Sequence, residues 1–570
     1  MKFNILKPAL AALVLVGTAC TANYLDINTN PYEPSEDDMQ TDGYIIGSAL
    51  TSLASTVVST DVNTAQFTDV LLGGPMGGYY STTGGFTRTI MNYNPTDDWT
   101  NVFMYSDRTI PVLYSNLREL KKVTDDPIVL AIADIIKVAA MHRVTDTYGP
   151  IPYSMIGENG QIQVPYDSQE KVYDKFFEEL DAAIKVLTEH RTDAISAKAD
   201  YIYGGSAEKW CKLANSLKLR LAMRIVYANE AKAREMAESA VNSEVGVITS
   251  NADNARLTSF GADGNPIYVA VNYNKPADCM TGGDTHAAAD IICYMNGYSD
   301  PRREKYFTQS EWPGQTYVGI RRGIVIPPLA SVGRKYSGVN ISISSPVTWM
   351  NAAEVAFLKA EAKGVFGFNM GSGEAKDFYD EGIRLSFEEW GVSGADTYLA
   401  NTTGKPQLYA DPANSNSYSQ ELSDITIAWD AGDPVQVSQV LFQLCQQVQG
   451  AQLRGRVPIL GGNLRAQAAH IGLFTVAHRK LAGTPNDASA LGYGHISGHR
   501  RGRVGQGTVL FGNDGFSTHG VVPPPYFSTA LMRRTPALEL SSFTMWNSPR
   551  SPVFSAWGPP QISKEYSPIL

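Results

Sequence analysis

Apolar residues recur at helical spacing between residues 99 and 390 of this 570-residue chain, and this periodicity is the feature that most constrains its fold. Asp126 can cap a helix that begins with Pro127, because proline is favoured at a first helical position. Ser206 can cap a second helix in the same way, and Asp167 with Glu170 forms a capping-box pattern at the start of another. The predicted helices carry the apolar sets Phe103, Ile110, Leu113, Leu117 and Leu120; Ile128, Ile132, Ile135, Ile136 and Ala139; Val172, Phe176, Leu180, Ile184 and Leu187; Trp210, Leu213, Leu217, Leu221 and Ile225; and the segments 353–366 and 374–390.

These helices follow one another in pairs, with short or irregular links between them. A chain of this kind is expected to be mostly α and to stack helical hairpins in the manner of tetratricopeptide units. No sequence repeat of about 34 residues accompanies the periodicity, so the prediction rests on the helix pattern alone.

The N-terminus reads as a targeting segment. Residues 9–16 are apolar and residues 17–19 are small, and Cys20 follows them directly. The apolar stretch is shorter than the roughly 20 residues that cross a bilayer. Cleavage as an ordinary secreted protein explains the small residues but not the cysteine, so we predict a lipoprotein signal peptide over 1–19, lipidation of Cys20 and a lipid-anchored tether over 20–40.

Composition excludes several classes of function. The net charge of −10 argues against nucleic acid as a partner. The five cysteines show no CxxC spacing, so neither a zinc site nor a redox motif is indicated, and no cofactor or metal is predicted.

Long Gly/Tyr/Asn/Thr-rich stretches, 72–93 and 259–284 above all, interrupt the helices. Loops of this length in a compact domain usually carry function. Flat aromatic rings can cover the apolar face of a sugar with little loss of rotamer entropy, and an arginine fork can donate to paired hydroxyl groups. The predicted ligand-binding residues are Tyr79, Tyr80, Trp99, Tyr273 and Arg321.

The alternative to a sugar-binding protein is an enzyme that acts on glycans. Glu388 and Glu389 stand beside Trp390, as a glycosidase carboxylate pair could. Adjacent helix positions diverge by about 100°, so these two carboxylates are not expected to flank one bond. The sequence has no GxSxG, HExxH or Walker motif. No catalytic residue is therefore predicted, and a secreted glycan-active hydrolase remains the second hypothesis.

Five stretches together resemble the SusD/RagB family of Bacteroidetes nutrient-binding lipoproteins. They are "NYLDINTNP" after Cys20, "HRVTDTYGPIPYS" (142–154), "EKWCKLANSLKLRLAMRI" (208–225), "MNGYSDPRREKYF" (295–307), and "AAEVAFLKAEA" with "GIRLSFEEWGV" (352–392). The resemblance implies a SusD-like helical body over 41–433 with an irregular, loop-rich ligand face. It also implies a non-catalytic protein on the outer-membrane surface that passes oligosaccharides, or in some members peptides, to a SusC-like TonB-dependent transporter.

Residues 434–570 differ in composition from the rest of the chain. No glutamate occurs between Glu421 and Glu539, and arginine replaces lysine as the main basic residue. Helical periodicity also gives way to Gly/Pro/Arg-rich runs. We interpret this tail as atypical, either a basic binding segment or the product of a reading-frame shift near residues 434–445.

Overall fold

The computed structural model describes residues 43–82, 101–105, 108–156, 163–277, 279, 281–324, 335–413 and 416–429. All of them belong to the first of two compact units, residues 1–476, and the second unit is residues 477–570. The predicted signal peptide, tether and atypical tail lie outside the described residues.

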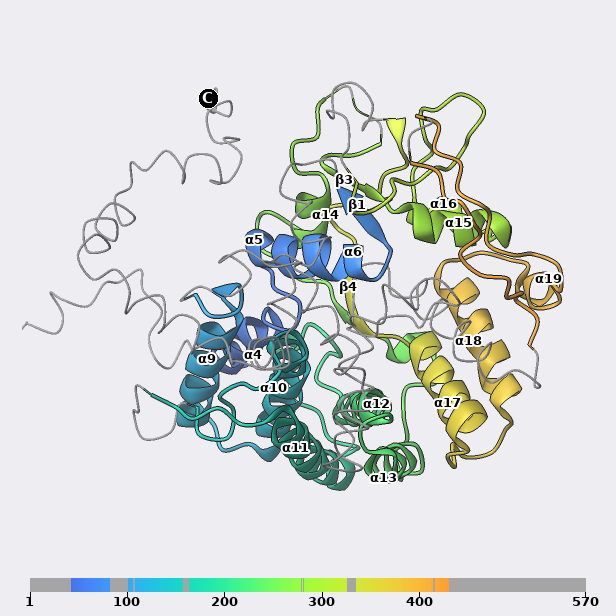
Figure 1. Ribbon diagram of the computed structural model, residues 1–570. Helices are drawn as coiled ribbons and strands as arrows, with labels where there is room; N and C mark the ends of the chain where they lie inside the picture. The colour runs from blue at the N-terminus through green and yellow to red at the C-terminus, as the bar shows by residue number, and fades with distance from the viewer. Residues whose placement is uncertain are drawn as a thin grey trace, which may run out of the picture. The chain divides into compact units, whose positions relative to one another are not determined.

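Helices make up about half of the described chain, and only four short strands accompany them there (Figure 1). This confirms the predicted mostly α fold. The helices are α4 (Tyr44–Ala54), α5 (Val62–Ala65), the π-helical η2 (Gln66–Gly73), α6 (Gly74–Met76), α9 (Thr109–Val123), α10 (Pro127–Tyr148), α11 (Gln169–Glu189), the short η3 (Ala197–Ala199), α12 (Ala207–Ile225), α13 (Glu230–Val241), η4 (Asn251–Asp253), α14 (Pro266–Val271), α15 (Ala289–Gly297), α16 (Arg303–Tyr306), α17 (Ala352–Phe366), α18 (Ala375–Glu389) and α19 (Ala395–Leu399). The strands are β1 (Tyr80–Thr82), β2 (Ala255–Leu257), β3 (Thr285–Ala287) and β4 (Val347–Met350).

The long helices pack as successive neighbours. Helix α10 contacts α9, α11, α12 and α4, while α12 contacts α13 and α17, and α17 pairs with α18 (Figure 1). Because α10 has neighbours on several sides, it is buried well beyond the predicted stripe, and Val138, Met141 and Val144 are buried too. An amphipathic stripe therefore underestimates the burial of a helix at the centre of a stack.

Local capping explains where the helices begin. The Asp126 carboxylate accepts a hydrogen bond from the Ile128 N–H at 2.8 Å, and Ser206 caps α12 as predicted. The predicted capping box at Asp167 is wrong, because Ser168 is the N-cap of α11. Asp167 instead accepts from the Ser154 N–H at 2.6 Å and so ties the preceding loop to the helix start.

A glycine sets the close packing of α17 against α18. A Cβ atom at Gly382 would lie 2.6 Å from Cε1 of Phe357, and Phe357 is fully buried. Only the missing side chain allows the two helices to approach so closely.

The stretch 295–307, one of the five that resemble the SusD/RagB family, connects the loop-rich region to α18. Arg302 is completely buried and forms an ion pair with Asp300 at 2.5 Å. Its Nη1 donates to the hydroxyl of Ser386 at 2.7 Å, and its guanidinium lies 4.6 Å from the ring centre of Phe387. Burial lowers the pKa of Arg302, but the charge of Asp300 outweighs this and raises it, so the pair stays ionised.

Candidate ligand-binding site

The loop-rich region is organised around the antiparallel pair β1–β3. Ser81 is the register partner of His286, and the Ala288 N–H donates to the Tyr79 carbonyl at 2.8 Å. The backbone after β3 also meets the segment that carries Arg321, because the Ile320 N–H donates to the Ala287 carbonyl at 2.8 Å. The pairing thus brings together segments that are about 200 residues apart in sequence.

Tyr79 and Tyr80, two of the predicted ligand-binding residues, lie in the core. Their exposed fractions are 6% and 1%. The Tyr80 ring fills the space above Gly74, where a Cβ atom would lie 2.3 Å from Tyr80 Cδ2. Burial, together with the charge of Asp69, raises the pKa of the Tyr80 phenol. Neither ring offers an open face to a sugar in this conformation.

The other predicted residues have different positions. Tyr273 is half-buried, and its carbonyl accepts from the Asp284 N–H at 2.8 Å. Arg321 is half-buried as well, and its Nη1 donates to the carbonyls of Asn416 and Ser417 at 3.2 and 3.1 Å. Trp99 and Cys20 lie outside the described residues.

Arg321 belongs to a set of side chains whose other members the sequence analysis did not single out. We call it the aromatic cluster. It consists of Trp312, Tyr336, Tyr409 and Tyr418 with the cations Arg321 and Lys335. The rings come from three separate segments and pack on a small apolar base that includes Cys293 of α15.

Within the cluster each half-buried ring stands against a buried tyrosine. Trp312 meets Tyr336 edge-on with ring centres 5.7 Å apart, and Tyr418 meets Tyr409 at 5.1 Å. The buried pair is fixed in turn: the Tyr336 hydroxyl donates to Asp411 at 2.7 Å, and the Tyr409 hydroxyl donates to the Gly319 carbonyl at 2.8 Å. Rings held in this way lose little further freedom when a ligand binds.

Each half-buried ring also carries a cation. The Lys335 ammonium lies 4.8 Å from the ring centre of Trp312, and the Arg321 guanidinium lies 5.0 Å from that of Tyr418. Burial raises the pKa of Tyr418 well above its usual value, so this phenol stays neutral. The exposed side of the cluster therefore combines aromatic surface with hydrogen-bond donors.

A tight turn presents Trp312. The Gln315 N–H donates to the Trp312 carbonyl at 3.2 Å, and Gly314 has a positive φ of 76°. Proline followed by a glycine of positive φ is the pattern of a type II turn. The dipeptide Pro313-Gly314 beside a tryptophan is the sequence signal that could have identified this residue.

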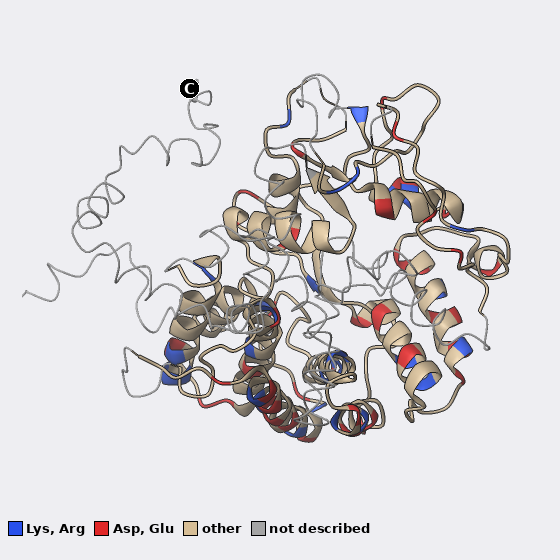
Figure 2. Ribbon diagram, viewed as in Figure 1, with Lys and Arg blue, Asp and Glu red and all other residues tan. Residues whose placement is uncertain are grey.

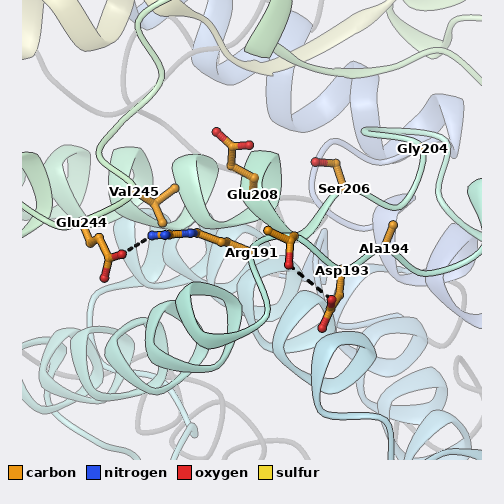
Figure 3. Close-up of a pocket in the computed structure, with 9 residues that line it drawn as sticks. Arg191, Asp193, Ala194, Gly204, Ser206, Glu208, Glu244 and Val245 are labelled. Carbon is orange, nitrogen blue, oxygen red and sulfur yellow. Dashed lines mark hydrogen bonds and ion pairs between the residues drawn. The ribbon is translucent and has the colours of Figure 1, made fainter.

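An open hollow of about 600 Å³ lies elsewhere, where α11 ends and α12 begins (Figure 3). Arg191 and Glu244 form an ion pair across it, and Thr192, Asp193, Ser206 and Glu208 add further polar groups to its wall. No aromatic residue is among its lining residues. It thus lacks the stacking surface expected of a sugar site, and we do not assign the ligand to it.

The pair Glu388–Glu389 has a structural role. Glu389 accepts from Arg256 at 2.7 Å and from Asn351 at 2.9 Å, whereas exposed Glu388 accepts from Asn251 at 3.0 Å. Burial raises the pKa of Glu389, and Arg256 opposes this rise. The two carboxylates thus join the end of α18 to neighbouring segments and do not face each other across a cleft.

The described part of the chain shows neither a metal site nor a membrane-spanning helix. No group of three His, Cys, Asp or Glu side chains there is arranged to hold a metal ion. No helix in that part is long and apolar enough to cross a membrane.

A stack of helical hairpins that carries a loop-rich region is the architecture of the SusD-like proteins, and the chain belongs to this family. The family described as "Susd and RagB outer membrane lipoprotein" matches residues 26–447. None of the curated proteins matches the chain.

Solved structures agree with this assignment. A SusD homologue from Bacteroides uniformis is 56% identical, with a TM-score of 0.68, over 71% of this chain and 84% of that one. A SusD homologue from Bacteroides thetaiotaomicron is 36% identical with a TM-score of 0.64, over 71% and 83%. A chitin-binding SusD homologue from Flavobacterium johnsoniae is 32% identical with a TM-score of 0.64, over 71% and 83%.

Proposed function

We propose that this protein is a non-catalytic, lipid-anchored glycan-binding protein of the outer-membrane surface, which captures oligosaccharides and passes them to a SusC-like TonB-dependent transporter. Family membership supports the outer-membrane lipoprotein class, and one similar structure is that of a chitin-binding homologue. The observation that carries the binding role is the aromatic cluster, in which two half-buried rings are each fixed by a buried tyrosine.

The cluster suits a sugar for physical reasons. Sugar rings have apolar C–H faces, which Trp312 and Tyr418 can cover, and Arg321 can donate to hydroxyl groups around them. Trp99 and Tyr273 remain candidates for further contacts. Tyr79 and Tyr80 act instead as buried supports of the β1 segment.

Titration calorimetry of the purified protein with a panel of oligosaccharides tests the proposal. Replacing an aromatic anchor costs about 2 kcal/mol at a binding site, so Trp312→Ala and Tyr418→Ala should each weaken binding about thirtyfold. Tyr227→Ala is the matched control, because Tyr227 is 37% exposed and packs on Phe366 in the helical body.

Chromatography of the same mixtures should show the oligosaccharide intact. Shorter products formed by wild-type protein would favour the hydrolase hypothesis instead. Unchanged affinity in both aromatic variants, with unchanged melting temperatures, would remove the cluster from the binding site.

A further inference from the structure

Charge around the aromatic cluster differs from charge elsewhere in the molecule. Acidic and basic residues both occur along α11, α13, α17 and α18 (Figure 2). The whole chain has a net charge of −10. The segment 312–336, by contrast, contains four basic residues and no aspartate or glutamate. The four are Arg321, Arg322, Arg334 and Lys335.

Two carboxylates that lie near these cations, Asp290 and Asp411, are already engaged. Asp290 holds Arg322 through two contacts, at 2.7 Å to Nε and 3.2 Å to Nη2. Asp411 is 2% exposed and accepts from the Tyr336 hydroxyl and from the backbone N–H groups of Ala413 and Asn416. Both are therefore poor partners for a further cation.

Arg334 lies outside the described residues, so Arg321 and Lys335 are the cations that remain. Within the described residues neither of them forms an ion pair, although exposed Glu311 is close by, since its N–H donates to the Lys335 carbonyl at 2.8 Å. Each instead lies over an aromatic ring of the cluster, at 4.8 Å for Lys335 and 5.0 Å for Arg321. Two positive charges that form no ion pair among the described residues are thus held against the two rings proposed to stack on the ligand.

We infer that the ligand of the aromatic cluster is an acidic saccharide, whose carboxylate or sulfate group lies against Arg321 and Lys335 while its ring covers Trp312 or Tyr418. This inference rests on the proposed function. A fixed cation beside an aromatic face attracts a charged sugar more strongly than a neutral one. Both ends of the cluster can contribute, since each half-buried ring has its own cation.

The test compares four probes of matched length by calorimetry with the full purified protein. Oligogalacturonate carries carboxylates, chondroitin sulfate oligosaccharides add sulfates, and malto- and chito-oligosaccharides are neutral. We expect at least one acidic probe to bind at least tenfold more tightly than either neutral probe. We also expect its affinity to fall several-fold between 50 and 300 mM salt, as screening predicts.

Four variants, one of them a control, test whether Arg321 and Lys335 supply the charge that binds the ligand. The double variant Arg321→Gln/Lys335→Gln should lose at least tenfold in affinity for the acidic probe, and Lys335→Arg should retain it. Arg384→Gln is the control, because Arg384 is an exposed residue of α18 paired with Asp396. Because Arg321 also holds the carbonyls of Asn416 and Ser417, melting temperatures are compared, and Lys335→Gln alone should still weaken acidic binding severalfold.

The possible outcomes distinguish the inference of an acidic ligand from the proposed glycan-binding function. Tighter binding of a neutral probe, or equal acidic affinity in the double variant, overturns the acidic ligand and leaves the glycan-binding function standing. Failure of the wild-type protein to bind any of the four probes counts against the proposed function and the inference together. Tighter binding of oligogalacturonate would show that carboxylates suffice, and tighter binding of chondroitin sulfate would indicate that sulfate contributes.

Discussion

His286 allows a quantitative prediction of how stability depends on pH. Its side chain, on β3, is fully buried, with Nε2 3.3 Å from the Thr281 hydroxyl and no hydrogen-bond partner for Nδ1 among the described residues. Burial lowers the pKa of His286 from 6.5 to about 4. The ring therefore stays neutral in the folded protein under conditions in which the unfolded chain takes up a proton.

The sign and size follow from proton linkage. Below pH 6.5 the unfolded state binds more protons than the folded state, so stability is lost as the pH falls from 6.5 towards 4. Integrated from pH 7.5 to 4.5, this single histidine lowers the free energy of unfolding by about 2–3 kcal/mol. Gln is polar and does not titrate, so His286→Gln should remove this part of the pH dependence.

Urea unfolding, followed by tryptophan fluorescence at pH 7.5, 6.5, 5.5 and 4.5, measures the effect. The free energy lost between the extreme pH values should be about 2–3 kcal/mol smaller in His286→Gln than in wild type, whatever its stability at pH 7.5. Burial also lowers the pKa of His142 to about 4. The free energy of unfolding should therefore still depend on pH, through His142, in both wild type and His286→Gln. His190→Gln is the control, since that side chain is 39% exposed. An unchanged pH slope in His286→Gln would refute the assignment of a neutral, buried ring.

Two further predictions concern packing and anchoring. Gly382→Ala should destabilise the protein by about 1–2 kcal/mol in urea unfolding, because the new methyl group would lie 2.6 Å from Phe357. Gly261→Ala is the control, since a Cβ atom there has no neighbour within 4 Å. In the double variant, Phe357→Leu should recover part of the stability lost in Gly382→Ala. Cys20→Ala should release the protein from membranes in cells that lack the transporter, because acyl chains contribute about 0.8 kcal/mol of membrane affinity per buried CH₂. If membrane fractionation still recovers the variant with the outer membrane, lipidation of Cys20 is not the anchor.

The sequence predicted most reliably those features that depend on local interactions. The caps at Asp126 and Ser206 involve residues within three positions of one another, and both lie where the pattern indicated. The capping box at Asp167 failed by one residue, because Ser168 competes for the same role and Asp167 serves the loop at Ser154. Neighbouring polar residues of similar capping strength leave such a boundary undetermined.

The position of an aromatic ring on a loop could not be predicted in the same way. Tyr79 and Tyr80 are buried because β1 pairs with β3, and that pairing joins positions about 200 residues apart. Glycine-rich sequence around the two tyrosines indicated a loop but carried no information about which segment would cover it. Arg321 was predicted as a hydrogen-bond donor, whereas its contact with the ring of Tyr418 depends on a second segment that the sequence did not connect to it.

The aromatic cluster also bears on the atypical tail. Its rings, cations and apolar base are supplied by residues between Ala289 and Leu422, and the segment that carries Tyr409 and Tyr418 joins α15 through the Gln407 N–H, which donates to the Cys293 carbonyl at 2.8 Å. None of these residues belongs to 434–570. Whether that tail is a basic segment or an out-of-frame product, the residues proposed to bind the saccharide precede it in the chain. The binding experiments therefore test the site independently of how the tail is explained.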